Sequence, residues 1–255
     1  MPGRTILQNS LSQHLSGIAA ARRRTRENEN PEGLHDLRVA IRALRAILPL
    51  LGKRKPVKAL RDQWKSIAHA TSPVRDLEVL IELLDHIPAE TGNVRIRLAA
   101  EEVIARRELF RMLASAEFPL LLQASRKLVV TPKNIPETPT LRKRAQKRAD
   151  NLLDSIREQI AVLGPETHAR DWHALRLTIK HLRYLIEHGG EWLPRTWGKL
   201  HPPLKQCQAA LGELHDLDML YERTPLRAPA LYAARQATAR NAVVDLERLI
   251  SHARA

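Results

Sequence analysis

The sequence predicts an all-α protein, and three observations lead to that class. Glycine is scarce, with 10 residues in 255, and no strand pattern is evident. Long stretches rich in Ala, Leu, Arg and Glu carry apolar residues at helical spacing. Hydrophobic residues make up 44% of the chain, which favours a folded core over a disordered polymer. A chain of this length forms one large domain or two small ones.

Periodicity and helix-start signals divide the chain into ten predicted helices. Asn30-Pro31 and Ser72-Pro73 each place a capping side chain before a proline, which is typical of helix starts. A break is expected near Pro119, and Thr131–Pro139 (TPKNIPETP) is the clearest linker. The predicted helices are 5–25, 32–51, 57–70, 73–86, 94–129, 139–162, 167–188, 199–211, 214–223 and 229–252.

One helical segment on each side of the linker carries a row of basic side chains, which we call the first and second ridges. The shared pattern is His-x-x-Arg-x-x-x-(Arg/Lys)-x-x-Arg. Because each helical residue advances by about 100°, the four positions fall within an arc of about 80°. Like charges at this spacing cost roughly 0.2–0.5 kcal/mol per pair, and a bound polyanion would turn that cost into affinity. The first ridge is His35, Arg38, Arg42 and Arg45, and the second is His173, Arg176, Lys180 and Arg183.

An apolar seam runs one residue ahead of each ridge. In each helix, therefore, one face is expected to pack into a core while the neighbouring face, about 100° away, presents cations. The four tryptophans are expected in the core or at an interface. The seams are Leu34, Leu37, Ile41, Leu44, Leu48 and Leu51, and Trp172, Leu175, Ile179, Leu182 and Ile186, and the remaining tryptophans are Trp64, Trp192 and Trp197.

The likeness between the two parts of the chain continues past the ridges. The ridges are separated by 138 positions, and six further residues recur at a separation of 140. Amphipathic helices give matched leucines easily, but they do not easily give the same His, three cations, Lys and Asp in one order. We therefore predict an internal duplication into two helical bundles related by a pseudo-two-fold axis. The matched residues are Leu60, Lys65, Ala70, Asp76, Leu77 and Leu80, and Leu200, Lys205, Ala210, Asp216, Leu217 and Leu220.

The charge balance points to an anionic partner. Lys and Arg total 42 against 28 Asp and Glu, which gives a formal charge of +14 and favours nucleic acid, anionic lipid or a phosphate polymer. Cys207 is alone, so no intramolecular disulfide can form, and a buried helix position in a reducing compartment is expected. No apolar run approaches a membrane span and no signal-peptide stretch is evident. We expect a cytoplasmic protein that does not bind membranes.

Nucleic acid is the main alternative partner. Single-strand binders generally stack bases on aromatic side chains, but aromatic residues are 4% of this chain. None of them interrupts the ridges except Tyr184, at an end. An all-helical basic protein could still grip duplex phosphates without sequence preference.

A metal-dependent phosphohydrolase is a further alternative, because His35-Asp36 and His215-Asp216 resemble the His-Asp pair of helical phosphohydrolases. Ala174 follows His173, however, so the first pair is not repeated. The arginines of the first ridge would also repel a cation, and no i,i+4 pair of ligands lies on either ridge. Phosphate-binding glycine loops and nucleophile elbows are absent too. We predict no metal, no cofactor and no enzymatic activity.

Together, LHDLRVAIRALRAIL, WHALRLTIKHLRYLIE, SPVRDLEVL and LGELHDLDML resemble the CHAD family, the conserved histidine α-helical domain proteins. The resemblance covers about residues 5–252. It implies two four-helix-bundle repeats, approximately 5–130 and 139–252 joined by the linker 131–139, around a basic central pore or groove. It also implies binding of inorganic polyphosphate, association with polyphosphate granules, and protein partners in polyphosphate metabolism.

The ligand-contacting positions of the family correspond to all eight ridge residues in this chain. Lys65, Arg75 and Lys205 are expected to extend the site into the pore. Ala43 follows Arg42 where relatives often have two adjacent basic residues, and His215 stands where Arg75 stands in the first copy. These departures imply a somewhat less cationic site. The Glu-x-Glu-x-Lys strand motif of triphosphate-tunnel hydrolases does not occur in this sequence.

Overall fold

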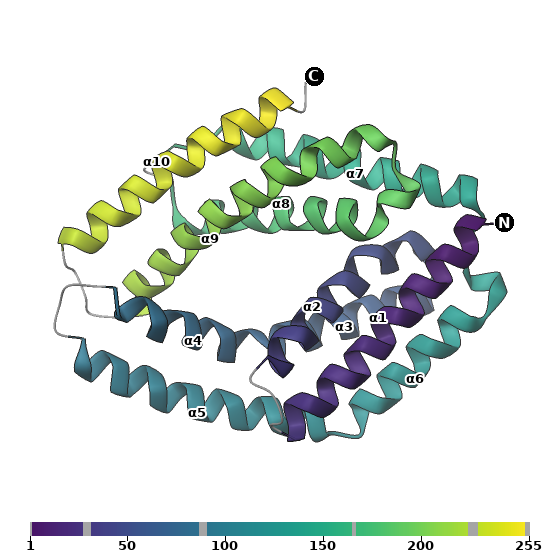
Figure 1. Cartoon of the computed structure of the whole chain (residues 1–255), viewed down its shortest axis with the longest axis horizontal. Helices are drawn as coiled ribbons and strands as arrows, with labels where there is room; N and C mark the ends of the chain where they lie inside the picture. Colours follow the sequence, from purple (N-terminus) through teal and green to yellow (C-terminus); the bar gives the residue numbers. More distant parts are fainter. Residues whose placement is uncertain (1, 28–31, 87–90, 165–166, 224–228, 253–255) are drawn as a thin grey trace. The chain divides into compact units, whose positions relative to one another are not determined.

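The computed structural model confirms the all-α class. It describes residues 2–27, 32–86, 91–164, 167–223 and 229–252, which contain helices and no strands (Figure 1). None of the helices in those residues is long and apolar enough to cross a membrane. In chain order the elements are α1 (Pro2–Glu27), α2 (Gly33–Ile47), η1 (Leu48–Leu51), α3 (Lys55–Ala70), α4 (Ser72–Leu84), α5 (Gly92–Ala114), α6 (Glu117–Val130), η2 (Pro132–Asn134), α7 (Thr138–Ile160), α8 (Ala169–Gly189), η3 (Gly190–Trp192), η4 (Arg195–Leu200), α9 (His201–Arg223) and α10 (Pro229–His252), where η marks a 3-10 helix.

The predicted helix 94–129 is interrupted, but not at its proline. The break between α5 and α6 lies at Ser115 and Ala116. Pro119 is the third residue of α6, where the backbone N–H that proline lacks would have no partner inside the helix. The predicted helix start at Ser72 agrees with the structure, whereas Asn30-Pro31 lies outside the described residues.

The prediction of two helices at 199–211 and 214–223 is wrong. A single helix, α9, continues through Gly212. Glycine inside a helix costs about 1 kcal/mol relative to alanine. Leu211 and Leu214 on either side are 1% and 0% exposed, and burying two leucines is worth more than that cost.

The described chain divides into two compact units, each assembled from separate segments. Unit 1 consists of Met1–Arg75, Glu102–Gln146 and Glu191–Leu193. Unit 2 consists of Asp76–Glu101, Lys147–Gly190 and Pro194–Ala255. Each unit draws on both sides of the linker, and the predicted duplication, which concerns the sequence, stays a prediction.

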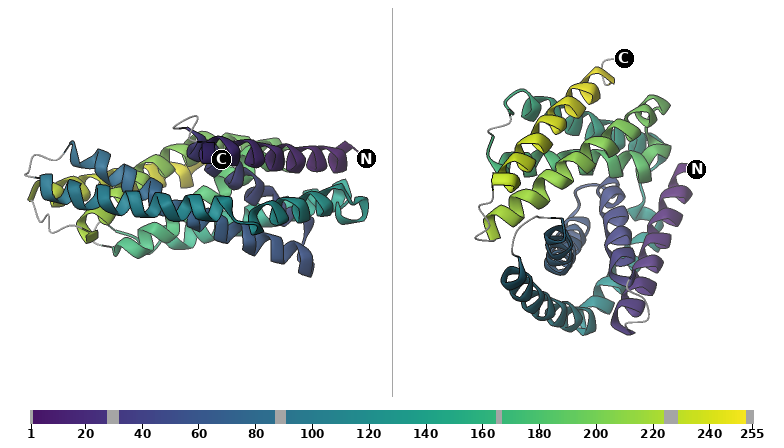
Figure 2. Two further views of the ribbon diagram at one scale, coloured as in Figure 1. Left: turned by 90° about the horizontal axis from the view of Figure 1, so that it is seen from below. Right: turned by 60° about the vertical axis from the view of Figure 1, so that its left-hand side comes forward.

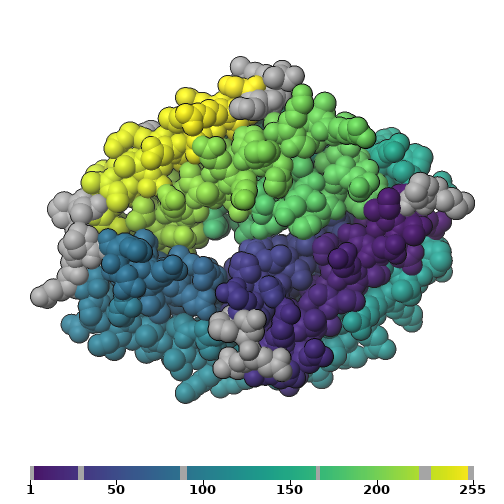
Figure 3. Space-filling view, in the orientation of Figure 1, coloured from purple at the N-terminus to yellow at the C-terminus, as the bar shows by residue number. Residues whose placement is uncertain are grey.

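In unit 1, α1 lies against α2 on one side and α6 on the other (Figures 1 and 3). The α1 side chains Leu7, Leu11 and Leu15 are fully buried, and the predicted seam of α2 and η1 is buried along its whole length. Trp64 meets Phe118 edge to face, with ring centroids 5.9 Å apart, and its indole N–H donates to Ser125 Oγ at 3.0 Å. The seam prediction is confirmed, and this core holds α2 with its cationic face outward.

In unit 2, α9 packs against α8 and against α10, which lies alongside it (Figure 2). The predicted seam of α8 is buried from Trp172 to Ile186. Cys207 is buried as expected, and its thiol donates to the carbonyl oxygen of Asp245 at 3.2 Å. All four tryptophans are buried, which confirms their predicted place in the packed interior.

Candidate functional site

The first ridge lies on α2, in unit 1. His35 is exposed and the three arginines are half-buried. Arg38 Nη1 donates to the Thr71 carbonyl oxygen at 2.6 Å and to Thr71 Oγ1 at 3.1 Å, so its guanidinium is held at the end of α3. Burial lowers the pKa of Arg45, but a guanidinium stays protonated at neutral pH.

The acidic residue at the start of α2 forms its ion pair outside the first ridge. Asp36 is the only acidic residue of α2, and it forms an ion pair with Arg24 of α1. Because Arg24 is outside the ridge, one carboxylate is neutralised by one additional cation. The cation that pairs with Asp36 therefore does not belong to the ridge.

The second ridge lies on α8, in unit 2, and begins with a pair of histidines. His173 Nδ1 lies 3.3 Å from His215 Nδ1 of α9, and the ring centroids are 4.5 Å apart. Burial, followed by Arg176, His173 and Lys180, lowers the pKa of His215 to about 4. Burial, Arg176 and Lys180 also lower the pKa of His173, against an opposing effect of Asp76. Both imidazoles are therefore neutral at pH 7, and one donates its Nδ1–H to the other.

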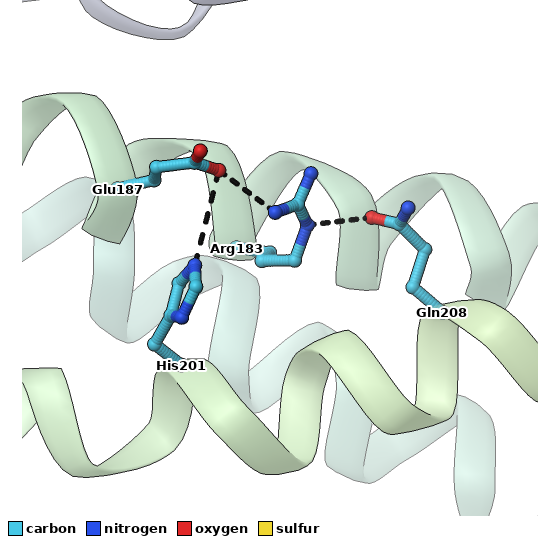
Figure 4. A network of polar contacts seen from close by, with 4 residues as sticks. All are labelled: Arg183, Glu187, His201 and Gln208. Atoms are coloured by element: carbon cyan, nitrogen blue, oxygen red, sulfur yellow. Dashed lines mark hydrogen bonds and ion pairs between the residues drawn. The ribbon is translucent and has the colours of Figure 1, made fainter.

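The far end of the second ridge is a network of polar contacts (Figure 4). Arg183 Nε donates to Gln208 Oε1 at 2.8 Å, and Nη1 donates to Glu187 Oε2 at 2.7 Å. The guanidinium carbon lies 4.1 Å from the centroid of the Tyr184 ring, and His201 Nε2 lies 3.8 Å from Glu187 Oε2. Only 11% of the Arg183 side chain is exposed. This arginine is therefore fixed between α8 and α9, with part of its charge balanced by Glu187.

The other predicted site residues are surface cations. Lys65 on α3, Arg75 on α4 and Lys205 on α9 are all exposed, and their part in a site stays a prediction. Sequence reasoning did not find the contact that His215 makes with His173, or the contact of Gln208 with the ridge. A signal existed for the histidine, because it occupies the place of Arg75 in the repeat.

The described residues do not form a candidate metal site. Within the ranges that the structure describes, no three His, Cys, Asp or Glu side chains gather so that they could hold a metal ion. The chemistry that the two ridges offer is instead a set of N–H donors with fixed positive charge, which suits phosphate oxygens.

The two helices with aligned cations, α2 and α8, belong to an all-α chain of two compact units. The sequence model of the CHAD domain matches residues 9–224, and the chain belongs to the CHAD domain family. No curated protein matches the chain in sequence.

Two solved structures share the fold. The crystal structure of the CHAD domain from the plant Ricinus communis superposes with a TM-score of 0.71 at 21% identity, covering 99% of this chain and 91% of that chain. PptA from Streptomyces chartreusis superposes with a TM-score of 0.61 at 17% identity, covering 98% of this chain and 96% of that chain.

Proposed function

We propose that this protein binds inorganic polyphosphate without hydrolysing it, through the cations of both ridges. The observation that carries the proposal is the alignment of donors along α2 and α8, beside seams that are buried. Guanidinium forks match phosphate oxygens, and the ammonium of Lys180 supplies a compact charge. The resemblance stated from the sequence adds the expectation that the family binds this polymer.

The alternative partner, nucleic acid, would have few aromatic rings on these helices on which to stack its bases. Residues 35–45 contain no Phe, Tyr or Trp, and Tyr184 beside the second ridge is in contact with the Arg183 guanidinium. Single-strand binding depends largely on stacking of bases on aromatic rings. A ligand made only of phosphates needs no such ring, so the ridges suit it better.

The deciding experiment is calorimetric titration with long-chain polyphosphate at physiological salt, with duplex DNA at equal phosphate concentration as the comparator. We expect tight binding to the polymer that weakens steeply as salt rises, because counterions are released, and much weaker binding to DNA. Equal affinity for DNA would reduce the ridges to a general polyanion surface.

A variant tests the site itself. Arg38 is left intact because its hydrogen bonds hold the end of α3, and the triple variant Arg42→Gln, Arg176→Gln, Lys180→Gln removes three ridge charges. The matched control, Arg107→Gln, Arg111→Gln, Arg240→Gln, removes three exposed charges from α5 and α10. We expect the ridge variant to lose at least about tenfold more affinity than the control. Equal losses would contradict the proposed site.

The absence of catalysis is tested on the same sample. Phosphate release from long-chain polyphosphate is followed for hours with and without Mg²⁺ or Mn²⁺. We expect no release above the protein-free blank, and metal-stimulated release would establish a phosphohydrolase instead. Granule association follows from the binding proposal, and fluorescence microscopy of cells that accumulate polyphosphate tests it with the ridge variant as control.

A further inference from the structure

Unit 1 carries a second concentration of positive charge, made of residues outside the ridges, which we call the basic end. Four segments meet there: the start of α1, the turn into α3, η2 and the first turns of α7. The start of α1 and the start of α7 are seen together at the right-hand edge of Figure 1. The basic residues are Arg4, Lys53, Arg54, Lys55, Lys58, Lys133, Arg142, Lys143 and Arg144.

Arginines join these segments by bonding to neutral oxygen atoms. Arg54 Nη2 donates to the Asn134 carbonyl oxygen at 2.8 Å, and its Nη1 donates to Asn134 Oδ1 at 3.2 Å. Arg144 Nη1 donates to the Leu50 carbonyl oxygen at 2.9 Å, and Arg4 bonds to the Pro132 carbonyl oxygen. A guanidinium whose bonds end on carbonyl groups keeps its net positive field, unlike one paired with a carboxylate.

The turn that presents the lysines depends on a glycine. Gly52 has φ +107°, a conformation that other residues rarely adopt, and an added Cβ would lie 2.9 Å from Arg144 Nη1. Gly52 therefore lets the backbone approach the Arg144 guanidinium closely. Lys53, Lys55 and Lys58 are all exposed.

Acidic residues are nearly missing from these segments. No Asp or Glu occurs from residue 37 to residue 61, and Glu137 is the only one from 118 to 149. Lys55 and Lys58 also lie in the first turn of α3, which holds no acid. The positive end of a helix dipole disfavours cations, so these lysines weaken the isolated helix. A bound anion would reverse that penalty.

We propose that the basic end is a second contact for the phosphate polymer, additional to the ridges and used only by long chains. This inference rests on the proposed function. Residues 37–61 connect the first ridge to the basic end, and they include no acidic residue. The aromatic side chain that bonds there, Trp192, is 2% exposed and donates to the Gly3 carbonyl oxygen. It offers no stacking surface for bases, which favours a ligand made only of phosphates.

The first test is chemical footprinting of the unmodified protein. Lysines are acetylated with a saturating amount of long-chain polyphosphate, of tripolyphosphate or of duplex DNA, and the modified sites are read by mass spectrometry. We expect the long polymer to protect Lys53, Lys55, Lys58 and Lys133 at least about fivefold, and tripolyphosphate to leave them reactive. Unchanged reactivity with the long polymer, or equal protection by DNA, would overturn the proposal.

The second test is the variant Lys53→Gln, Lys55→Gln, Lys58→Gln, compared with the control Arg107→Gln, Arg111→Gln, Arg240→Gln. We expect the lysine variant to bind long-chain polyphosphate about tenfold more weakly than the control. Its logarithmic salt slope should fall by about 2, on the scale of about 0.7 per phosphate contact found for single strands. Its tripolyphosphate affinity should match that of the control. Equal affinity of the two variants for the long polymer would refute the basic end while leaving the ridges standing, whereas failure of the wild type to bind would refute the proposed function.

Discussion

Acidification should destabilise unit 2 through the pair formed by His173 and His215. The pKa of His215 is lowered from 6.5 to about 4 in the folded chain, so the unfolded chain binds more protons between those values. Stability therefore falls as the pH drops through that window, and the effect is absent above pH 7. When both imidazoles are positively charged, the N–H···N contact is also lost, because both Nδ1 atoms, 3.3 Å apart, then carry hydrogen.

The size of this effect follows from the two pKa values. At pH 5 the full difference between the two pKa values lowers the free energy of unfolding by roughly 2 kcal/mol. The imidazole is only half-buried, so solvent screening reduces the expected loss to about 1 kcal/mol. Arg176, Lys180 and Asp76 all act on His173 electrostatically.

The assay is denaturant unfolding at pH 7.5 and pH 5 for the wild type, for His215→Asn, and for His69→Asn. His69 is an exposed histidine of α3 and serves as the control. On acidification, the free energy of unfolding of the wild type and of the control should fall by about 1 kcal/mol more than that of His215→Asn. If all three proteins lose the same stability, the histidine pair is not the source and the reasoning is refuted.

Four further outcomes are expected. Arg235→Ala should cost about 3–5 kcal/mol in denaturant unfolding, because it leaves the carboxylate of Asp218, 2.5 Å from Arg235 Nε, buried without its cation; the double replacement by leucines should recover most of that loss. Gly52→Ala should cost about 1–3 kcal/mol through its strained backbone and the Arg144 guanidinium beside it, and an unchanged midpoint would contradict this. Cys207 should resist thiol reagents until the chain unfolds, because burial raises the pKa of its thiol to about 12, and a rapid reaction of the folded protein would show an open site. If polyphosphate binds at the second ridge, calorimetry near pH 6.5 in buffers of different ionisation enthalpy should report proton uptake, because an anion raises the pKa values of the histidine pair.

The parts of the fold that depend on neighbouring residues were predictable from the sequence. The apolar seams of α2 and α8 are buried as expected, because the 3.6-residue period is set within one helix. The same period placed the ridges beside those seams. The break at 212–213 was predicted wrongly. Whether a glycine interrupts a helix depends on how much its neighbours are buried, here Leu211 and Leu214, and local sequence does not show that.

The parts that depend on contacts between helices were not predictable. His215 and His173 are 42 residues apart, and their contact follows from how α9 packs on α8. The basic end is a similar case, because Arg54 and Asn134 are 80 residues apart and Arg144 and Leu50 are 94 apart. The contacts that bring these basic segments together depend on the fold.

The segment Glu191–Leu193 belongs to unit 1 but is synthesised long after the other segments of that unit. Its Trp192 is buried and donates to the carbonyl oxygen of Gly3 at a separation of 189 residues. Domains generally fold as units while the ribosome adds roughly 5–20 residues per second. Unit 1 therefore cannot close around its last tryptophan until residues 76–101 and 147–190 of unit 2, which include α8, have been translated. A nascent chain stalled before Trp192 would expose the place that this side chain fills, which makes early folding of the N-terminal helices dependent on the later sequence.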